Sequence, residues 1–443
     1  MGVRIRGKVR LRGAVKVVSK AGQENMMDRS GHMIDPSVGY ARGDILSSPL
    51  EESRRHQHAL HIIQRRVTAN GVNGFFNFTG LHRDYQINPQ QISLAEEWVG
   101  PGLFADELAK RTLEHLGGGP EHAVAVFNRA TAGIVAACLA LATPGSKVIS
   151  VVPGTRSHPS LARGVALASA ELEEISTLRA MQEILNSFNV SLIVITGVSS
   201  ELEVIDECIL MEAIRLARAY GIASLLDDAY GARLRPIIYG QPKTLTTGVD
   251  LGITSCDKAG LGGPRAGLMA GRPDLMSRVM AQAGELGLEA RPPLSLGVCA
   301  SLANFDPSRL RREVELGGIL YERLGQRFGT ARVKRTGLGA TIPEEDAWEL
   351  VRALRPAGEK MSLVPAEITA GMGIYWLKRY GMITVNALGQ PGARVSLRFK
   401  PDPAEVERFG GTSALLEAIA DGFRAIAEKA GSPSEMKKLI LGE

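Results

Sequence analysis

Short apolar segments alternate regularly with helical stretches from residue 100 to about residue 290, and this pattern limits the possible folds most strongly. The apolar segments that have the length of buried strands are Ala123–Phe127, Lys147–Val152, Leu192–Thr196, Ala223–Leu226 and Leu251–Thr254. Helical patterns such as Ala130–Ala142 and Cys208–Tyr220 lie between them. Such alternation is typical of a parallel sheet with helices on both faces. The sequence therefore predicts a large α/β domain over residues 100–290.

The 443 residues are too many for one ordinary core, and we expect three segments. Residues 1–99 contain a basic N-terminal arm and a helix from a capping box at Ser48 to about Val67. The run Arg291-Pro292-Pro293 interrupts the alternating pattern, so residues 291–443 are expected to form a smaller α+β domain. The helices predicted there cover 296–304, 307–328 and 413–430, and the strands Gly373–Trp376, Met382–Asn386 and Arg394–Phe399.

Charge and cysteine content exclude several classes of protein. The net charge of +5 comes from the first twenty residues, which carry seven Lys or Arg and no acid, so it does not indicate a nucleic-acid-binding body. The four cysteines lack the spacing of a zinc site, and we expect no metal. No apolar run approaches the roughly 20 residues of a membrane span. We expect a cytoplasmic protein in a reducing compartment.

Ligands of an open parallel sheet bind beyond the carboxyl ends of its strands, so the residues after each strand are the candidates. Ala130 and Thr131 follow the first strand at the start of a helix, where backbone N–H groups could hold a phosphate; an ordinary helix cap is the alternative. His158 follows the second strand and could stack on a flat cofactor ring, move protons or only cap a helix. Ser200 follows the third and could donate a hydroxyl to a ligand.

Two adjacent acids, Asp227 and Asp228, follow the fourth strand. Buried carboxylates need partners, and one of these could keep a pyridine nitrogen protonated. A metal site built from both acids and His158 is the alternative, and the absence of a third acid nearby argues against it.

Lys258 follows the fifth strand and precedes a glycine-rich run, Gly260-Leu261-Gly262-Gly263. Desolvation at a strand end lowers the pKa of a lysine and makes its amine a good Schiff-base nucleophile. A surface lysine in a turn is the alternative for Lys258 taken alone. The ordered set of phosphate loop, His, Asp and Lys favours pyridoxal 5′-phosphate (PLP) as cofactor.

The Asp-x-Ala-Tyr motif at 227–230, followed by a strand and Lys258, resembles fold-type I PLP enzymes of the aspartate aminotransferase type. The run from Asp257 and Lys258 through Leu261-Gly262-Gly263-Pro264-Arg265-Ala266-Gly267 is most similar to selenocysteine synthase, and more closely to its archaeal relatives of unassigned reaction. The resemblance covers about residues 70–430. It implies a large, mostly parallel-sheet domain and a smaller C-terminal domain.

The resemblance also implies roles for particular residues. Lys258 would hold PLP as a Schiff base, Asp227 would pair with the pyridine nitrogen and His158 would stack on the ring. Ala130 and Thr131 would hold the phosphate, and Ser200 would lie near the ring hydroxyl. Arg394, or second Arg398, would bind a substrate carboxylate, and a structural ion pair is the alternative for an arginine in a strand.

These roles predict a PLP-dependent enzyme that acts on an amino acid or aminoacyl substrate through the Schiff base of Lys258. Lyase or sulfur/selenium-type transferase chemistry is expected by analogy. Bacterial selenocysteine synthase often has another residue in place of His158, so selenium transfer does not follow from the lysine motif. Aminotransferase or aldolase chemistry, and a PLP-carrying tRNA-binding or regulatory protein without turnover, are the alternatives. We expect a homodimer or a larger even assembly, and no membrane partner.

Overall fold

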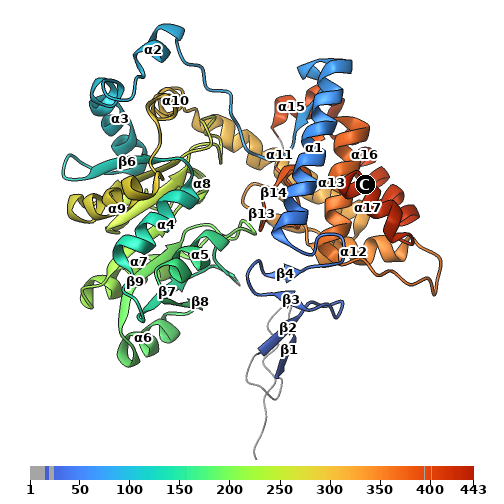
Figure 1. The fold of residues 1–443 in the computed structure, drawn as a ribbon, viewed down its shortest axis with the longest axis horizontal. Helices are drawn as coiled ribbons and strands as arrows, with labels where there is room; N and C mark the ends of the chain where they lie inside the picture. Colours follow the sequence, from blue (N-terminus) through green and yellow to red (C-terminus); the bar gives the residue numbers. More distant parts are fainter. Residues whose placement is uncertain (1–14, 19–23, 155, 394, 401) are drawn as a thin grey trace, which may run out of the picture. The chain divides into compact units, whose positions relative to one another are not determined.

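The computed structural model describes residues 15–18, 24–154, 156–393, 395–400 and 402–443, and these form two compact units (Figure 1). The sheet unit comprises Gly80–Glu315 and Thr336–Leu338. The terminal unit comprises the described residues up to Thr79, Leu316–Arg335 and Gly339–Glu443. These limits differ from the expected boundaries at residues 99 and 290. One reason is that Pro292–Ala303 forms a helix that packs on Gly100–Leu116 in the sheet unit.

A seven-stranded sheet forms the centre of the sheet unit, with strand order β6-β12-β11-β10-β9-β7-β8. Its strands are β6 (Ala123–Phe127), β7 (Lys147–Val151), β8 (Glu171–Ile175), β9 (Val190–Thr196), β10 (Ala223–Asp227), β11 (Leu251–Ser255) and β12 (Gly267–Gly271). Strands β8, β7, β9, β10 and β11 run parallel, and β12 is antiparallel to both β11 and β6. All five predicted strands are confirmed within two residues at either end, as is the α/β class.

Strands β8 and β12 were not predicted, for different physical reasons. Strand β8 lies at the edge of the sheet and carries Glu171, Glu173 and Glu174, so it lacks the apolar pattern of a central strand. Strand β12 is fully buried but begins and ends with glycine, which in sequence resembles a turn.

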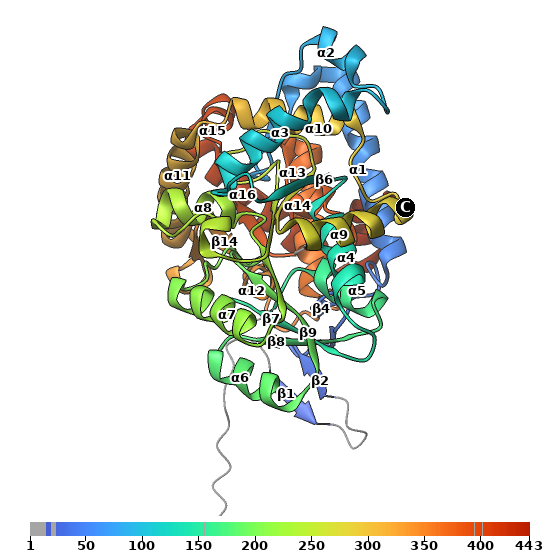
Figure 2. The ribbon, with the colours of Figure 1, turned by 90° about the vertical axis from the view of Figure 1, so that its left-hand side faces the viewer.

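The helices of the sheet unit are α2 (Pro89–Leu94), α3 (Gly100–Leu116), α4 (Ala130–Leu141), α5 (Pro159–Leu167), α6 (Leu178–Ser187), α7 (Glu207–Ala219), α8 (Gly231–Tyr239), α9 (Pro273–Leu286) and α10 (Pro292–Ala303). Helices α4, α5 and α9 pack together on one face of the sheet, and both views show them side by side (Figures 1 and 2). Residues of α3, α6 and α7 belong to the core on the other face. Successive strand residues such as Leu192 and Ile193 enter opposite cores, as a doubly covered sheet requires.

The terminal unit is mostly helical. Its helices are α1 (Pro49–Asn70), α12 (Glu344–Ala353), α13 (Pro365–Tyr380), α14 (Val385–Leu388), α15 (Pro403–Arg408), α16 (Gly411–Lys429) and α17 (Pro433–Leu441), and helix α11 (Pro307–Phe328) crosses the unit boundary. Its strands are β1 (Val15–Val18), β2 (Glu24–Met27), β3 (Ile34–Asp35), β4 (Tyr40–Ala41), β5 (Phe76–Asn77), β13 (Lys334–Thr336), which ends across the boundary, β14 (Gly339–Ile342), β15 (Met382–Ile383) and β16 (Leu397–Phe399). The helix predicted after Ser48 is confirmed, with the Ser48 hydroxyl accepting from the Glu51 N–H.

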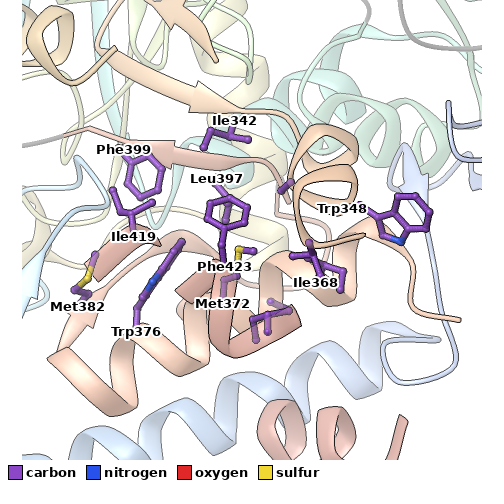
Figure 3. Packing of buried hydrophobic residues seen from close by; sticks show 14 of the residues in the cluster. Ile342, Trp348, Ile368, Met372, Trp376, Met382, Leu397, Phe399, Ile419 and Phe423 are labelled. Atoms are coloured by element: carbon purple, nitrogen blue, oxygen red, sulfur yellow. The ribbon is translucent and has the colours of Figure 1, made fainter. Parts of the chain in front are cut away.

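One strand predicted in this unit is wrong, and another is confirmed only at its start. Gly373–Trp376 lies inside helix α13, and Met382–Asn386 is a two-residue strand followed by helix α14. Helix α13 is buried over most of its length, so β-prone residues there gain more from tertiary packing than from local preference. Trp376 is fully buried beside Phe399 and its indole N–H donates to the Ala418 carbonyl at 2.9 Å (Figure 3). The third predicted strand is confirmed only as Leu397–Phe399.

None of the helices within the described ranges is long and apolar enough to cross a membrane.

Candidate functional site

Asp227 and Lys258 come together at the carboxyl ends of neighbouring strands. Asp227 is the last residue of β10, in register with Thr196 of β9 and Ile253 of β11. Lys258 follows β11 by three residues, and its charge is close enough to lower the pKa of Asp227. Its Nζ lies 4.6 Å from the centre of the Tyr230 ring. The Lys and Asp predicted to act on one ligand are therefore on the same edge of the sheet.

Asp228 is fully satisfied by neighbouring side chains. Its side chain is completely buried, and Arg235 donates to both carboxylate oxygens, from Nε at 2.9 Å and from Nη2 at 2.5 Å. The Thr244 hydroxyl donates to Oδ2 at 2.7 Å. A metal bound by Asp227, Asp228 and His158 would have to displace these donors, so the geometry does not favour that alternative.

Asp227 is also buried but has far less compensation. Its Oδ1 accepts from the Ala229 N–H at 3.2 Å, and burial raises the pKa of its carboxyl to about 6, against the lowering effects of Lys258 and of this bond. A buried carboxylate with a raised pKa is stabilised when a positively charged group binds beside it. Asp227 can thus pair with a protonated ring nitrogen. The carboxylate of Asp228 is already hydrogen-bonded to Arg235 and Thr244.

Thr196 gives an independent test of whether a polar ligand fits here. Its hydroxyl is buried and has no hydrogen-bond partner among the residues that the structure describes. Residues in register on adjacent strands present their side chains on the same face, so Thr196 lies beside Asp227. An orphaned hydroxyl costs about 1–3 kcal/mol, which a bound polar ring would recover. The residues present therefore fit PLP at the Asp227 end.

The start of helix α4 fits a phosphate. Its N-cap is Arg129, which makes no side-chain capping bond, so the first N–H groups of the helix are not capped by a side chain. Gly267 of β12 lies against this turn: a Cβ there would be 2.6 Å from both the Cα and the N of Ala130. Backbone N–H groups at a helix start, approached closely by a glycine strand, form an anion site. Ala130 and Thr131 are the first two residues of this helix.

Three arginines interact with a single buried carboxylate, Asp257, close to this helix start. Arg83 donates to Asp257 at 2.7 Å. Burial lowers the pKa of Arg129 and of Arg265. The positive charges of Arg129 and Arg83 lower the pKa of Arg265 further, whereas the charge of Asp257 raises the pKa of both arginines. Three positive charges against one negative leave an excess that a phosphate of charge about −2 would balance. This excess also favours a phosphate as the ligand.

His158 is the N-cap of helix α5. Its Nδ1 accepts from the Ser160 N–H at 3.2 Å and lies 2.7 Å from the Ser160 hydroxyl oxygen, so the capping interpretation is confirmed. Its role against a cofactor ring stays a prediction. Ser200 lies partly exposed in a turn closed by the bridge between Val198 and Val204, and its contact with a ring hydroxyl also stays a prediction.

The predicted carboxylate-binding residues belong to the terminal unit. Arg394 lies outside the described residues. Arg398 is in the middle of β16, paired with Thr341 of β14, in the unit that does not contain Lys258. The assignment of a substrate carboxylate to either arginine therefore stays a prediction.

Sequence reasoning missed several residues of this edge. Arg129 and Arg265 stand inside the two motifs already identified, so their charge beside a phosphate loop was a readable signal. Arg83 lies 174 positions from Asp257 and had no local signal. Tyr230 was recognised only as part of the Asp-x-Ala-Tyr motif, although its ring lies under the Lys258 amine.

Four relatives support a family assignment. A UPF0425 pyridoxal phosphate-dependent protein of Methanothermobacter thermautotrophicus is 34% identical over 90% of this chain and 100% of its own length. One from Methanosphaera stadtmanae is 31% identical over 86% of this chain and 97% of its own. The two others carry the same description. No family model matches the chain.

Solved structures show the fold. N-succinyldiaminopimelate aminotransferase from Mycobacterium tuberculosis matches with a TM-score of 0.54 and 17% identity, covering 84% of this chain and 96% of its own. Aspartate aminotransferase from Thermotoga maritima gives 0.52 and 15%, with coverage of 84% and 96%. SepCysS in complex with the SepCysE N-terminal domain gives 0.53 and 14%, with coverage of 82% and 98%. The fold is thus that of the fold-type I PLP enzymes, and the chain belongs to the UPF0425 family of pyridoxal phosphate-dependent proteins.

Proposed function

We propose that this protein is a PLP-dependent enzyme that acts on an amino acid or aminoacyl substrate, with Lys258 forming the Schiff base to the cofactor. One observation carries the proposal. The buried carboxyl of Asp227, which has a raised pKa, lies at the end of β10, next to the end of β11 that is followed by Lys258. The helix that starts at Ala130 follows β6 of the same sheet. The family assignment supports the cofactor.

The residues of the site have separate tasks in this proposal. PLP, when bound, supplies an electron sink for charge that develops at the α-carbon of an amino acid. Asp227 would hold a positive charge at the ring nitrogen, and the helix start with its arginines would bind the phosphate. The Lys258 amine would take the proton from the α-carbon of the substrate. Tyr230 limits the directions that this amine can take, because its ring packs against it.

For the reaction class we propose lyase or sulfur/selenium-type transferase chemistry. The support is the similarity of the sequence around Lys258 to selenocysteine synthase. The fold is also shared with SepCysS, as it is with other PLP enzymes. We further propose an even homo-oligomer in the cytoplasm. The cysteines Cys138, Cys208, Cys256 and Cys299 are free, which agrees with a reducing compartment.

Reduction with borohydride tests the cofactor assignment. The purified protein is reduced and digested, and mass spectrometry is used to find a pyridoxyl group on Lys258. Lys258→Ala should abolish the modification. Lys243→Ala is the matched control, because Lys243 lies in the same unit but donates to the Glu114 carbonyl. A wild-type protein that carries no pyridoxyl group on Lys258 after incubation with PLP would disprove the proposal.

A screen of amino acids then tests the reaction class. Each is added to the PLP-loaded protein, visible spectra are recorded, and products are analysed for β- or γ-elimination, replacement, amino transfer and aldol cleavage. Elimination or replacement products support the proposed class. Amino transfer or aldol cleavage alone would refute it while leaving the cofactor assignment intact.

A further inference from the structure

Arg233 is a fully buried arginine whose hydrogen bonds go to backbone carbonyls around the candidate site. It lies in helix α8 and none of its side chain is exposed. Its guanidinium donates to the carbonyls of Ser255 at 2.7 Å, Lys258 at 3.1 Å and Ala229 at 3.3 Å. Nη1 lies 3.2 Å from His115 Nε2. One side chain thus contacts the end of β11, the carbonyl of Lys258 itself and the loop after Asp227.

The electrostatics of this arginine are unusual for a structural residue. Burial lowers the pKa of Arg233 to about 10, and the acids Asp228 and Asp257 and the thiol of Cys256 oppose this from a distance. Burial and the charge of Arg233 also hold the pKa of His115 well below its usual range, so His115 is neutral and can accept through Nε2. Burying a cation that is bonded mainly to carbonyls is costly. A destabilising buried cation of this kind is expected where its hydrogen bonds fix a geometry that the function requires.

That geometry is the turn at Lys258. The next residue, Ala259, has a φ of 51°, in the left-handed region that non-glycine residues rarely adopt, and Gly260 continues it with a φ of 78°. The Lys258 carbonyl receives two donors, Arg233 Nε at 3.1 Å and the Leu261 N–H at 3.2 Å. The bonds of Arg233 to Ser255 and Ala229 connect this turn to the end of β11 and to the loop that follows Asp227. Arg233 therefore joins the two strand ends whose side chains must act on the same ligand.

We propose that Arg233 is the positioning residue for Lys258: its guanidinium holds the strained turn so that the lysine amine meets the cofactor held by Asp227 and the start of helix α4. This inference rests on the proposed function. The inference goes beyond the proposed function because it gives Arg233 a specific role: Arg233 supports the covalent linkage between Lys258 and the cofactor, and not cofactor binding in general.

The test compares Arg233→Lys with Arg235→Lys. A lysine at 233 keeps the charge, but a single nitrogen cannot reach Ser255, Lys258 and His115 together. Arg235 is the matched control because it is equally buried, lies two residues away and binds Asp228 instead of the Lys258 turn. Each variant is titrated with PLP, which can link to Lys258, and with pyridoxamine 5′-phosphate, which lacks the aldehyde and cannot.

We expect Arg233→Lys to weaken PLP binding about tenfold, the loss expected for one hydrogen bond from a charged donor, and to change pyridoxamine phosphate binding less than about twofold. Arg235→Lys should change both affinities by the same factor. Equal losses for both ligands in Arg233→Lys, or no loss, would overturn the proposal.

His115→Leu keeps the proposal testable if Arg233→Lys does not fold. It removes one acceptor of Arg233 without touching the Lys258 turn, and we expect a smaller loss in the same direction, again confined to PLP. Unchanged or equally reduced affinities for the two ligands would count against the positioning role. A wild-type protein without a borohydride-trapped group on Lys258 would instead refute the proposed function, and the inference with it.

Discussion

Two neighbouring regions at the end of strand β10 handle a buried carboxyl in opposite ways. Around Asp228, Arg235 and Thr244 form a closed network in which charges and donors are matched. Around Asp227, the carboxyl has one backbone donor and a raised pKa, and the hydroxyl of Thr196 has no partner in the described part of the chain. The first region is complete without a ligand, whereas the second gains from one. Residues adjacent in sequence can thus be divided between stability and function.

Lys258→Ala should have the largest effect on the region of Asp227. It removes the only group there that we expect to bond covalently to PLP, so borohydride trapping and turnover should be lost. The domain should still fold, because the Lys258 turn is held by backbone contacts of its carbonyl. Mass spectrometry and circular dichroism measure the two effects. Retained turnover in this variant would contradict the division of roles.

Asp228→Asn should lower the free energy of unfolding more than substitutions of the residues that we expect to bind the cofactor. It leaves the buried Arg235 without its carboxylate, and breaking such a pair costs about 3–5 kcal/mol of the free energy of unfolding. Urea denaturation of the PLP-free protein measures this loss. If Asp228→Asn were as stable as wild type while PLP binding fell, the assignment of the two acids would have to be exchanged.

The pH dependence of stability isolates Asp227. Its pKa of about 6 in the folded protein lies above the reference value of 3.8, so the folded state keeps a proton that the unfolded state releases between these values. The contribution of Asp227 to the free energy of unfolding of the PLP-free protein should therefore fall as pH rises from about 4 to 6, by at most about 3 kcal/mol, and then level off.

Asp227→Asn is the comparison for this pH effect. It cannot lose a proton, so the fall from about pH 4 to 6 should be smaller in the variant than in wild type, and the variant should be the more stable PLP-free protein at pH 7. Denaturation series at each pH measure the difference. Identical slopes in both proteins would show that Asp227 is not the titrating group.

Gly267→Ala should have the smallest effect and tests the phosphate end. The added methyl group would meet the backbone of Ala130 at 2.6 Å, so we expect a loss of about 1–3 kcal/mol in stability and weaker PLP binding. Gly284→Ala is the matched control, because nothing lies within 4 Å of its Cβ position in helix α9. Unchanged PLP affinity in Gly267→Ala would mean that the strand does not form part of the anion site.

The central sheet was largely predictable because its signals are local. Ala123–Phe127 and the other buried strands are continuous apolar runs, and the candidates Asp227 and Lys258 follow two of them directly. The rule that ligands bind beyond the carboxyl ends of parallel strands was enough to place both on one edge. The terminal unit was less predictable, because the run Ile374-Tyr375-Trp376 has a local preference for strands, which the burial of helix α13 overrides.

The α/β class, the strand ends and the motif around Lys258 could all be predicted from local sequence, since apolar periodicity and residue order are properties of short segments. The three-dimensional packing was needed to show that Asp228 is paired with Arg235 while Asp227 is not, and that Asp257 binds Arg83 and interacts with Arg129 and Arg265. It also placed the buried Arg233 on the carbonyls around Lys258. Burial and through-space charge set these differences, and both depend on segments that are distant in the chain.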